Sequence, residues 1–273
     1  MPELPEARTI ARRLHEAAAG AVIAHVRLLR RDMLRTGTPA RLSALAGQTI
    51  TAVGTRGKYV IVFTPASRFV IQLGMSGQLR LTPAAGPLPL HTHLVIRLKD
   101  ERQILYINTR RIASGLHLLA AGTDDTGPLS LLGPDATDIS AEAFVAAIRT
   151  RRRAIKTALM DPSLLAGVGN IYSDEALFRA GIRPTRRAHR VGSAGLCRLH
   201  QAVRQVLAEA IAAGGSSLKD SNPYVDADGR LGEFSIRHRV YGRGGQPCLA
   251  CHTTLRSAVI GGRTSTFCPR CQK

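Results

Sequence analysis

Two Cys-x2-Cys pairs near the C-terminus constrain the fold of this chain more than any other feature. The pairs are Cys248–Cys251 and Cys268–Cys271, and sixteen residues separate them. Each pair can hold one side of a metal ion from a tight turn, and the gap has the length of a β-hairpin. Four thiolates complete a tetrahedral Zn²⁺ site and leave no position open for a substrate, so the spacing predicts one structural zinc ion.

Two other uses of these cysteines have to be weighed. Two disulfides would suit a secreted domain, but the chain begins without the basic stretch and apolar stretch of a signal peptide. A redox pair is the other alternative. A redox function needs only one Cys-x2-Cys pair, so the second pair at this distance argues against it. Cys197, the fifth cysteine, lies on an apolar helical stripe, and we expect it to be buried.

The net charge indicates the kind of partner. The 273 residues carry 38 Lys and Arg against 19 Asp and Glu, a formal charge of +19. Such a chain repels itself unless it meets a polyanion, and no apolar run approaches the roughly 18 residues of a membrane-spanning helix. With no Trp, five Tyr and six Phe, base stacking on single strands is disfavoured. We therefore expect contacts with the phosphates of duplex DNA and none with a membrane.

The texture of the sequence changes twice along the chain. Residues 9–19 have apolar positions at helical spacing, and residues 21–119 contain at least six short β-rich runs such as "KYVIVFT" and "HLVIRLK". This pattern predicts a β-sandwich or barrel. The Gly-, Pro- and Asp-rich stretch at 120–140 reads as a linker.

After the linker the pattern is helical. Ser140 is a candidate cap for "AEAFVAAIRT", Asp161 and Pro162 suggest a second helix start, and "NIYSDEALFRAG" ends in a glycine stop. A helical stripe predicts a long helix between Ser193 and the pair Gly214–Gly215. The stripe is formed by Leu196, Leu199, Val203, Val206, Leu207 and Ala210. Residues 216–235 read as a loop or lid.

The first ten residues, "MPELPEARTI", raise a separate question. Pro5 and Glu6 suit a first helical turn, where proline fits and a carboxylate faces the positive end of the helix dipole. Pro2 and Glu3 come too early for that explanation. They need another one.

Several motifs occur together in one order: "PELPE", "GKYV", "LGMSG", "LMD" with "GVGNIYSDEALF", "GGSSLKD", "VYGR" and the four cysteines. In combination they resemble formamidopyrimidine-DNA glycosylase, from end to end. The resemblance implies an α+β, multidomain fold: an N-terminal β-sandwich with an N-terminal helix at 1–130, a helix–two-turns–helix domain with a lid loop at 131–235, and a four-cysteine zinc-finger hairpin at 236–273. Endonuclease VIII, the nearest alternative, looks like "PEGPE" where this chain has Leu4.

The resemblance implies a chemical role for the chain end. Once Met1 is removed, Pro2 is a secondary amine, and α-amino groups titrate near 8, so part of it is neutral at pH 7. Pro2 is then the expected nucleophile, Glu3 the acid/base and Glu6 a positioning carboxylate, unless Glu6 is only a helix-start acid. Lys58 resembles the lysine of β-elimination, although exposed lysines are usually only solvated. Arg263, at the expected hairpin tip, resembles the arginine that grips phosphate.

The resemblance also assigns DNA contacts. Met75, Arg110 and Ile112 match the residues that fill the gap left by an everted base, although such aliphatic side chains are more often core. The family pattern Asp-Pro-Arg-Arg-Phe-Gly is here Asn108-Thr109-Arg110-Arg111-Ile112-Ala113, so an aliphatic wedge replaces phenylalanine. The remaining matches are the DNA-contacting positions His91, Arg151, Lys156 and Asn170, of which Asn170 matches an asparagine that binds backbone phosphate. The cluster "RTRRRAIK", which contains Arg151 and Lys156, could otherwise be a solvated basic face.

The expected function is base-excision repair by a bifunctional glycosylase/AP lyase. It excises oxidised purines such as 8-oxoguanine and formamidopyrimidines, and then nicks the strand by β,δ-elimination. An endonuclease VIII-like relative with shifted lesion preference and a non-catalytic zinc-ribbon DNA-binding protein remain the alternatives. We expect a monomer in the bacterial cytoplasm, associated with the nucleoid.

Overall fold

The computed structural model describes residues 2–122, 127–218 and 223–273. The chain forms two compact units, Met1–Ser130 with Ala213–Glu233, and Leu131–Ala212 with Phe234–Lys273. Each is described by itself. The expected lid motif "GGSSLKD" falls partly outside the described residues, at Lys219 and Asp220, as does part of the expected linker, at residues 123–126.

The first unit opens with helix α1 (Leu4–Ala18), which begins earlier than the apolar spacing alone indicated. Its inner face buries Ala7, Ile10 and Leu14 in the same apolar core as the strands. Among the described residues of this unit, the other helical elements are a 3₁₀ turn (Arg31–Met33), the short helix α2 (Pro39–Ser43) and a second 3₁₀ turn (Gly127–Leu129).

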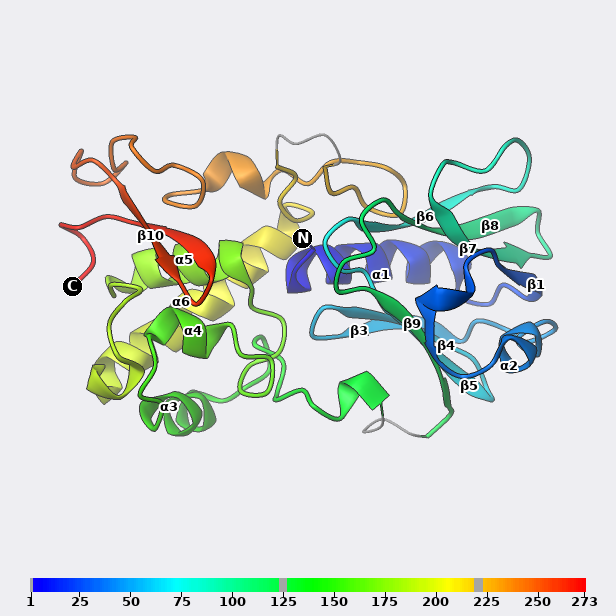
Figure 1. Cartoon of the computed structure of the whole chain (residues 1–273), viewed down its shortest axis with the longest axis horizontal. Helices are drawn as coiled ribbons and strands as arrows, with labels where there is room; N and C mark the ends of the chain where they lie inside the picture. The colour runs from blue at the N-terminus through cyan, green and yellow to red at the C-terminus, as the bar shows by residue number, and fades with distance from the viewer. Residues whose placement is uncertain (1, 123–126, 219–222) are drawn as a thin grey trace. The chain divides into compact units, whose positions relative to one another are not determined.

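The strands of this unit form two sheets, a β-sandwich as predicted (Figure 1). The four-stranded sheet has the order β1-β7-β8-β6 and the five-stranded sheet β2-β9-β5-β4-β3. The strands are β1 (Ile23–Leu28), β2 (Leu34–Thr36), β3 (Ala52–Arg56), β4 (Tyr59–Phe63), β5 (Ser67–Gln72), β6 (Gly77–Pro83), β7 (Thr92–Leu98), β8 (Arg102–Asn108) and β9 (Gly115–Ala120). The chain passes from one sheet to the other three times: between β1 and β2, between β5 and β6, and between β8 and β9.

The second unit is helical and carries one hairpin. Its elements are α3 (Ala141–Arg149), α4 (Ile155–Leu159), α5 (Asn170–Ala180), a 3₁₀ turn (Ala188–Arg190), α6 (Ser193–Ala212), another 3₁₀ turn (Phe234–Arg237), β10 (Arg256–Ile260) and β11 (Arg263–Phe267). The Ser140 hydroxyl caps α3 by accepting from the Ala143 N–H, Gly181 ends α5 at φ +72°, and the apolar stripe of α6 is buried. Strand β11 lies against α5 (Figure 1).

Two sequence-based expectations were wrong in this unit. No helix starts at Asp161: residues 161–167 form turns, because the Asp161 carboxylate accepts hydrogen bonds from both the main-chain N–H and the hydroxyl of Ser163. Cys197 is exposed on α6, not buried. Within the described residues, no helix is long and apolar enough to cross a membrane.

Candidate active site and nucleic-acid interface

The start of α1 fixes the expected nucleophile in place. Glu3 is the N-cap residue, and its main-chain N–H donates to the Glu6 carboxylate over 2.8 Å. Glu3 and Glu6 are 2% and 1% exposed, and Pro2 is buried beside them. The two glutamates form a reciprocal capping box, so the helix start anchors the end of the chain.

Glu6 also holds a segment from late in the sequence. Its second carboxylate oxygen accepts from the Ser216 N–H over 2.7 Å, and the Tyr224 hydroxyl donates to the Glu6 carbonyl over 3.3 Å. Gly215 has φ +88°, and a Cβ there would lie 2.8 Å from the Glu6 carboxylate. Burial, with the nearby Glu6 charge adding to it, raises the pKa of Tyr224, so its hydroxyl remains a donor.

Lys58 occupies a tight turn. Gly57 and Lys58 form the two-residue connection between β3 and β4, where Arg56 pairs with Tyr59 and Gly57 has φ +57°. The Lys58 side chain is half-buried. Pro2, Glu3, Glu6 and Lys58 therefore all belong to the first unit, whereas Arg263 belongs to the second.

The three expected void-filling residues lie on two adjacent loops. Met75 is on the β5–β6 loop, and Arg110 and Ile112 are on the β8–β9 loop. The Met75 N–H donates to the Ile112 carbonyl over 3.2 Å, which joins the loops. Ile112 is 52% exposed, as a wedge must be, and Met75 is half-buried. His91 is exposed just before β7 and has φ +62°.

In the second unit, the hairpin β10–β11 presents Arg263. A Gly261–Gly262 turn connects the strands, Ile260 pairs with Arg263, and the Arg263 side chain is exposed at this tip. Asn170 begins α5, and its side-chain amide donates to the Thr264 carbonyl over 3.1 Å. The structure thus places Asn170 next to the strand that carries Arg263.

Lys156 is placed differently from what the sequence indicated. It is 0% exposed, and its ammonium donates to the Asp174 carboxylate over 2.7 Å. Asp174 also accepts from the Ser265 hydroxyl over 2.6 Å and the Thr266 N–H over 3.0 Å. Burial raises the pKa of Asp174, and the Lys156 charge opposes that rise. The assignment of Lys156 as a direct DNA contact is therefore corrected: it holds the hairpin against α4 and α5.

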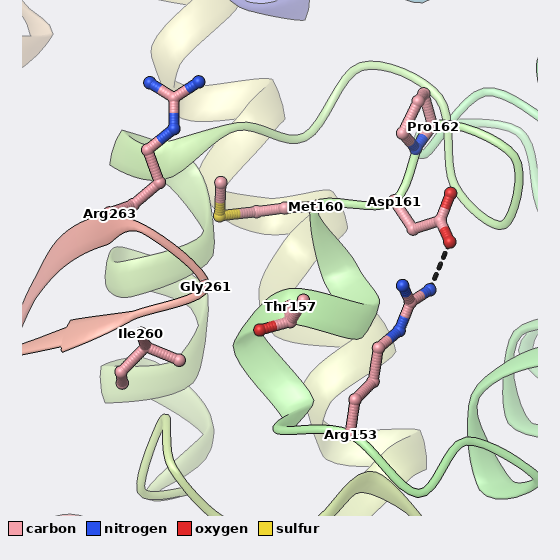
Figure 2. A pocket seen from close by; sticks show the side chains of 8 residues that line it. All are labelled: Arg153, Thr157, Met160, Asp161, Pro162, Ile260, Gly261 and Arg263. Atoms are coloured by element: carbon pink, nitrogen blue, oxygen red, sulfur yellow. Dashed lines mark hydrogen bonds and ion pairs between the residues drawn. The ribbon is translucent and has the colours of Figure 1, made fainter.

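A hollow of about 350 Å³ lies beside the hairpin tip (Figure 2). The guanidinium of Arg153 and the carboxylate of Asp161 form an ion pair on its wall. Arg151 lies two residues before Arg153 in the sequence, in the segment after α3. Its side chain is exposed and donates to the Ala147 carbonyl over 3.2 Å. The hollow is lined by Arg153, Thr157, Met160, Asp161, Pro162, Ile260, Gly261 and Arg263.

Two acidic residues of this unit, Asp174 and Glu175, are not indicated by any of the sequence motifs. The buried Glu175 carboxylate accepts from the main-chain N–H groups of Arg239, Val240 and Tyr241 over 2.8–3.0 Å. The available signal was a pair of acids in the middle of an apolar helix in a strongly basic chain. Buried acids of this kind are kept only where donors satisfy them.

The four expected metal ligands converge. Their sulfur atoms all lie within 4.8 Å of one another, with 3.5 Å between Cys251 and Cys268 and 4.0 Å between Cys248 and Cys271. A tetrahedron with Zn–S bonds of about 2.3 Å has S···S edges of about 3.8 Å. The residues therefore fit one tetrahedral Zn²⁺ ion.

Three family models match the chain: the formamidopyrimidine-DNA glycosylase N-terminal domain at residues 1–114, the formamidopyrimidine-DNA glycosylase H2TH domain at 132–222, and a zinc finger found in FPG and IleRS at 245–273. The chain is 41% identical to a formamidopyrimidine-DNA glycosylase of Syntrophotalea carbinolica, over all of both chains. It is 36% identical to that of Bacillus subtilis, over 100% of this chain and 99% of the relative.

Two solved structures are similar over nearly the whole chain. The complex between Lactococcus lactis Fpg and DNA containing an abasic site has a TM-score of 0.90 at 30% identity, covering 99% of each chain. MutM (FPG) from Thermus thermophilus has a TM-score of 0.89 at 36% identity, covering 99% of this chain and 98% of the other. With the zinc-finger match and the sulfur geometry, the four cysteines hold one structural zinc ion.

Proposed function

This chain belongs to the formamidopyrimidine-DNA glycosylase family, and we propose that it excises oxidised purines from duplex DNA and then nicks the strand through a Schiff base at Pro2. As a member of that family it is a base-excision repair glycosylase. The observation that carries the mechanism is the anchored chain end, where Pro2 lies beside the capping box of Glu3 and Glu6.

The anchored end suits nucleophilic catalysis. The Pro2 nitrogen attacks C1′ of the damaged nucleotide, and the base leaves with the electrons of the broken C1′–N bond and a proton. Opening of the sugar leaves an iminium between Pro2 and C1′. Loss of a C2′ proton then expels the 3′ phosphate, and a second elimination expels the 5′ phosphate.

The family resemblance supports the other catalytic roles. Glu3 transfers protons at the sugar, and Lys58 serves β-elimination. Arg263 holds a phosphate of the damaged nucleotide from the hairpin tip, where a guanidinium can bind two oxygens at once. Glu6 has both oxygens occupied by main-chain N–H groups, so we assign it to positioning rather than to proton transfer.

DNA recognition divides between the two units. We propose that Met75, Arg110 and Ile112 fill the gap left by the everted base, while His91, Arg151 and Asn170 contact phosphates. Lys156 acts indirectly, by holding the hairpin that bears Arg263. The exposure of Ile112 supports its role as a wedge.

The substrate assignment is tested by comparing excision of 8-oxoguanine, formamidopyrimidine and oxidised pyrimidines from otherwise identical duplexes. We expect the two purine lesions to be removed fastest. Dominant pyrimidine excision would instead favour the endonuclease VIII-like alternative. That alternative is motivated by Ile112, which replaces the phenylalanine of the family pattern.

We propose that the protein acts as a monomer in the bacterial cytoplasm, at the nucleoid where its DNA substrate lies. We also keep the three modules 1–130, 131–235 and 236–273 as a proposal. The family matches at 1–114, 132–222 and 245–273 support it, whereas packing groups residues 213–233 with the first unit.

A further inference from the structure

Asn108 ends strand β8 at the base of the loop that carries Arg110 and Ile112. It is 0% exposed, and it stands where the family pattern has aspartate. An amide donates and accepts hydrogen bonds, whereas an ionised carboxylate only accepts. The replacement therefore changes what this buried position can hold.

The Asn108 side chain forms hydrogen bonds through both its oxygen and its nitrogen. They reach the two void-filling loops, β5–β6 and β8–β9, and Tyr106 on strand β8 itself. Its oxygen accepts from the Ser76 hydroxyl over 2.7 Å and from the Arg111 N–H over 2.9 Å. Its amide nitrogen donates to the Leu73 carbonyl over 3.2 Å and to the Tyr106 hydroxyl over 2.8 Å. All four hydrogen-bonding positions of the amide are thereby occupied.

The Asn108 main chain reaches a third loop. Its N–H donates to the His91 carbonyl over 3.0 Å, and its carbonyl lies 2.8 Å from the His93 ring nitrogen. Met75, Arg110, Ile112 and His91, the DNA-contacting residues proposed for the first unit, thus all lie on segments bonded to this one residue.

The two void-filling loops approach too closely to adjust independently. A Cβ at Gly74 would lie 2.3 Å from the Ile112 carbonyl oxygen, and Gly74 has φ +66°. Arg111 and Ala113 have φ +54° and +49°, which surrounding contacts have to maintain. The Ser76 hydroxyl, itself bonded to Asn108, accepts from the Arg110 N–H over 2.9 Å.

We propose that Asn108 is a positioning residue that sets the two void-filling loops in the arrangement needed to replace an everted base. The inference rests on the proposed function. The two hydrogen bonds that the Asn108 amide donates carry the inference. An aspartate at 108 would instead point a carboxylate oxygen at the Leu73 carbonyl oxygen. It would also face the Tyr106 hydroxyl, whose hydrogen is already donated to the Gln72 carbonyl over 3.2 Å.

The test is Asn108→Asp, which keeps the shape and removes the donors. Two substrates separate void filling from chemistry: an 8-oxoguanine duplex, and a single-stranded oligonucleotide with a preformed abasic site, which has no stack to fill. We expect excision from the duplex to fall about tenfold or more, the scale of one unsatisfied buried group, while single-strand cleavage stays within about twofold. A 2-aminopurine beside the lesion should lose the fluorescence change that reports insertion.

Gln103→Glu is the matched control, because it makes the same amide-to-carboxylate change at a buried position near the other end of β8. It should leave the duplex-to-single-strand ratio unchanged. Ser76→Ala, a milder second variant, should lower the ratio in the same direction as Asn108→Asp. The inference is overturned if both Asn108→Asp and Ser76→Ala keep the wild-type duplex-to-single-strand ratio. It is also overturned if activity falls equally on both substrates. Either result leaves the proposed function intact. A wild-type protein inactive on both DNAs overturns the proposed function and the inference with it.

Discussion

At the scale of single residues, Glu6 connects parts of the chain that are 210 positions apart in the sequence. Its carboxylate accepts from the main chain of Glu3 on one side and of Ser216 on the other, in a buried environment. The residue therefore determines where Pro2 lies and where the segment after Gly215 begins. A helix-start acid would need only the first of these contacts.

Replacing Glu6 by Gln should break one of the two contacts, because one main-chain N–H then faces an NH₂ group. It should also weaken the other contact, because a neutral amide oxygen is a weaker acceptor than a carboxylate. We expect a loss of about 2 kcal/mol in unfolding free energy and about a tenfold slower excision, measured by denaturant titration and single-turnover kinetics. Glu16→Gln, on the exposed face of the same helix, is the control. Equal behaviour of the two variants would show that Glu6 is only a helix-start acid.

His238 supplies a pH dependence of stability. It is buried among the rings of Phe234 and Tyr241, and burial lowers its pKa to about 4. Between about pH 6.5 and pH 4 the unfolded chain binds the extra proton and the folded chain does not. Stability from this residue therefore falls as the pH is lowered through that window, by up to about 3 kcal/mol.

The measurement is the unfolding free energy from pH 7 to pH 4. His238→Phe should flatten the slope relative to wild type, whatever its effect at pH 7. His189→Gln, at an exposed histidine, should leave the slope unchanged. A His238→Phe slope identical to wild type would contradict this account.

At the scale of elements, the sequence predicted those features that depend on neighbouring residues: helix caps, helix ends and strands. Ser140 capped α3, Gly181 ended α5, and the alternating runs became strands. The spacing of the four cysteines predicted the hairpin between them. The start at Asp161 failed because its carboxylate bonds to Ser163 in a turn, an outcome that the same residue types permit.

The parts that could not be predicted depend on distant partners. Nothing near Lys156 in the sequence announces Asp174, eighteen residues away, or the Thr264 carbonyl. The bond from Ser216 to Glu6 and the four bonds of the Asn108 side chain are likewise contacts of the folded chain. The family resemblance supplied the proposed site residues, but not the buried contacts around them.

The pair Lys156–Asp174 should carry the attachment of the hairpin. Lys156→Met leaves a buried carboxylate without its cation, and we expect about 3 kcal/mol or more of lost stability together with weaker DNA binding. Lys156→Met with Asp174→Asn should recover part of the loss, because the uncompensated charge is gone. Denaturant titration of the zinc-loaded protein measures both, and additive losses in the double variant would argue against the pair.

At the scale of the whole molecule, the +19 charge predicts binding that depends steeply on salt. Each phosphate contact releases condensed counterions, so affinity for a lesion duplex should fall about a hundredfold or more between roughly 50 and 200 mM salt. Arg151→Gln should lower the log–log slope by about one, whereas Arg27→Gln, an exposed arginine on β1, should not. A nearly salt-independent affinity would contradict a phosphate-based interface.

The most direct test of the central claim is borohydride trapping on DNA that contains 8-oxoguanine. Reduction of the iminium should give a covalent protein–DNA adduct whose DNA maps to Pro2, and Pro2→Gly should lose most of the adduct and of the strand cleavage. Cleavage by wild type without any trapped adduct, or a Pro2→Gly protein that cleaves as well as wild type, would contradict the Schiff-base mechanism.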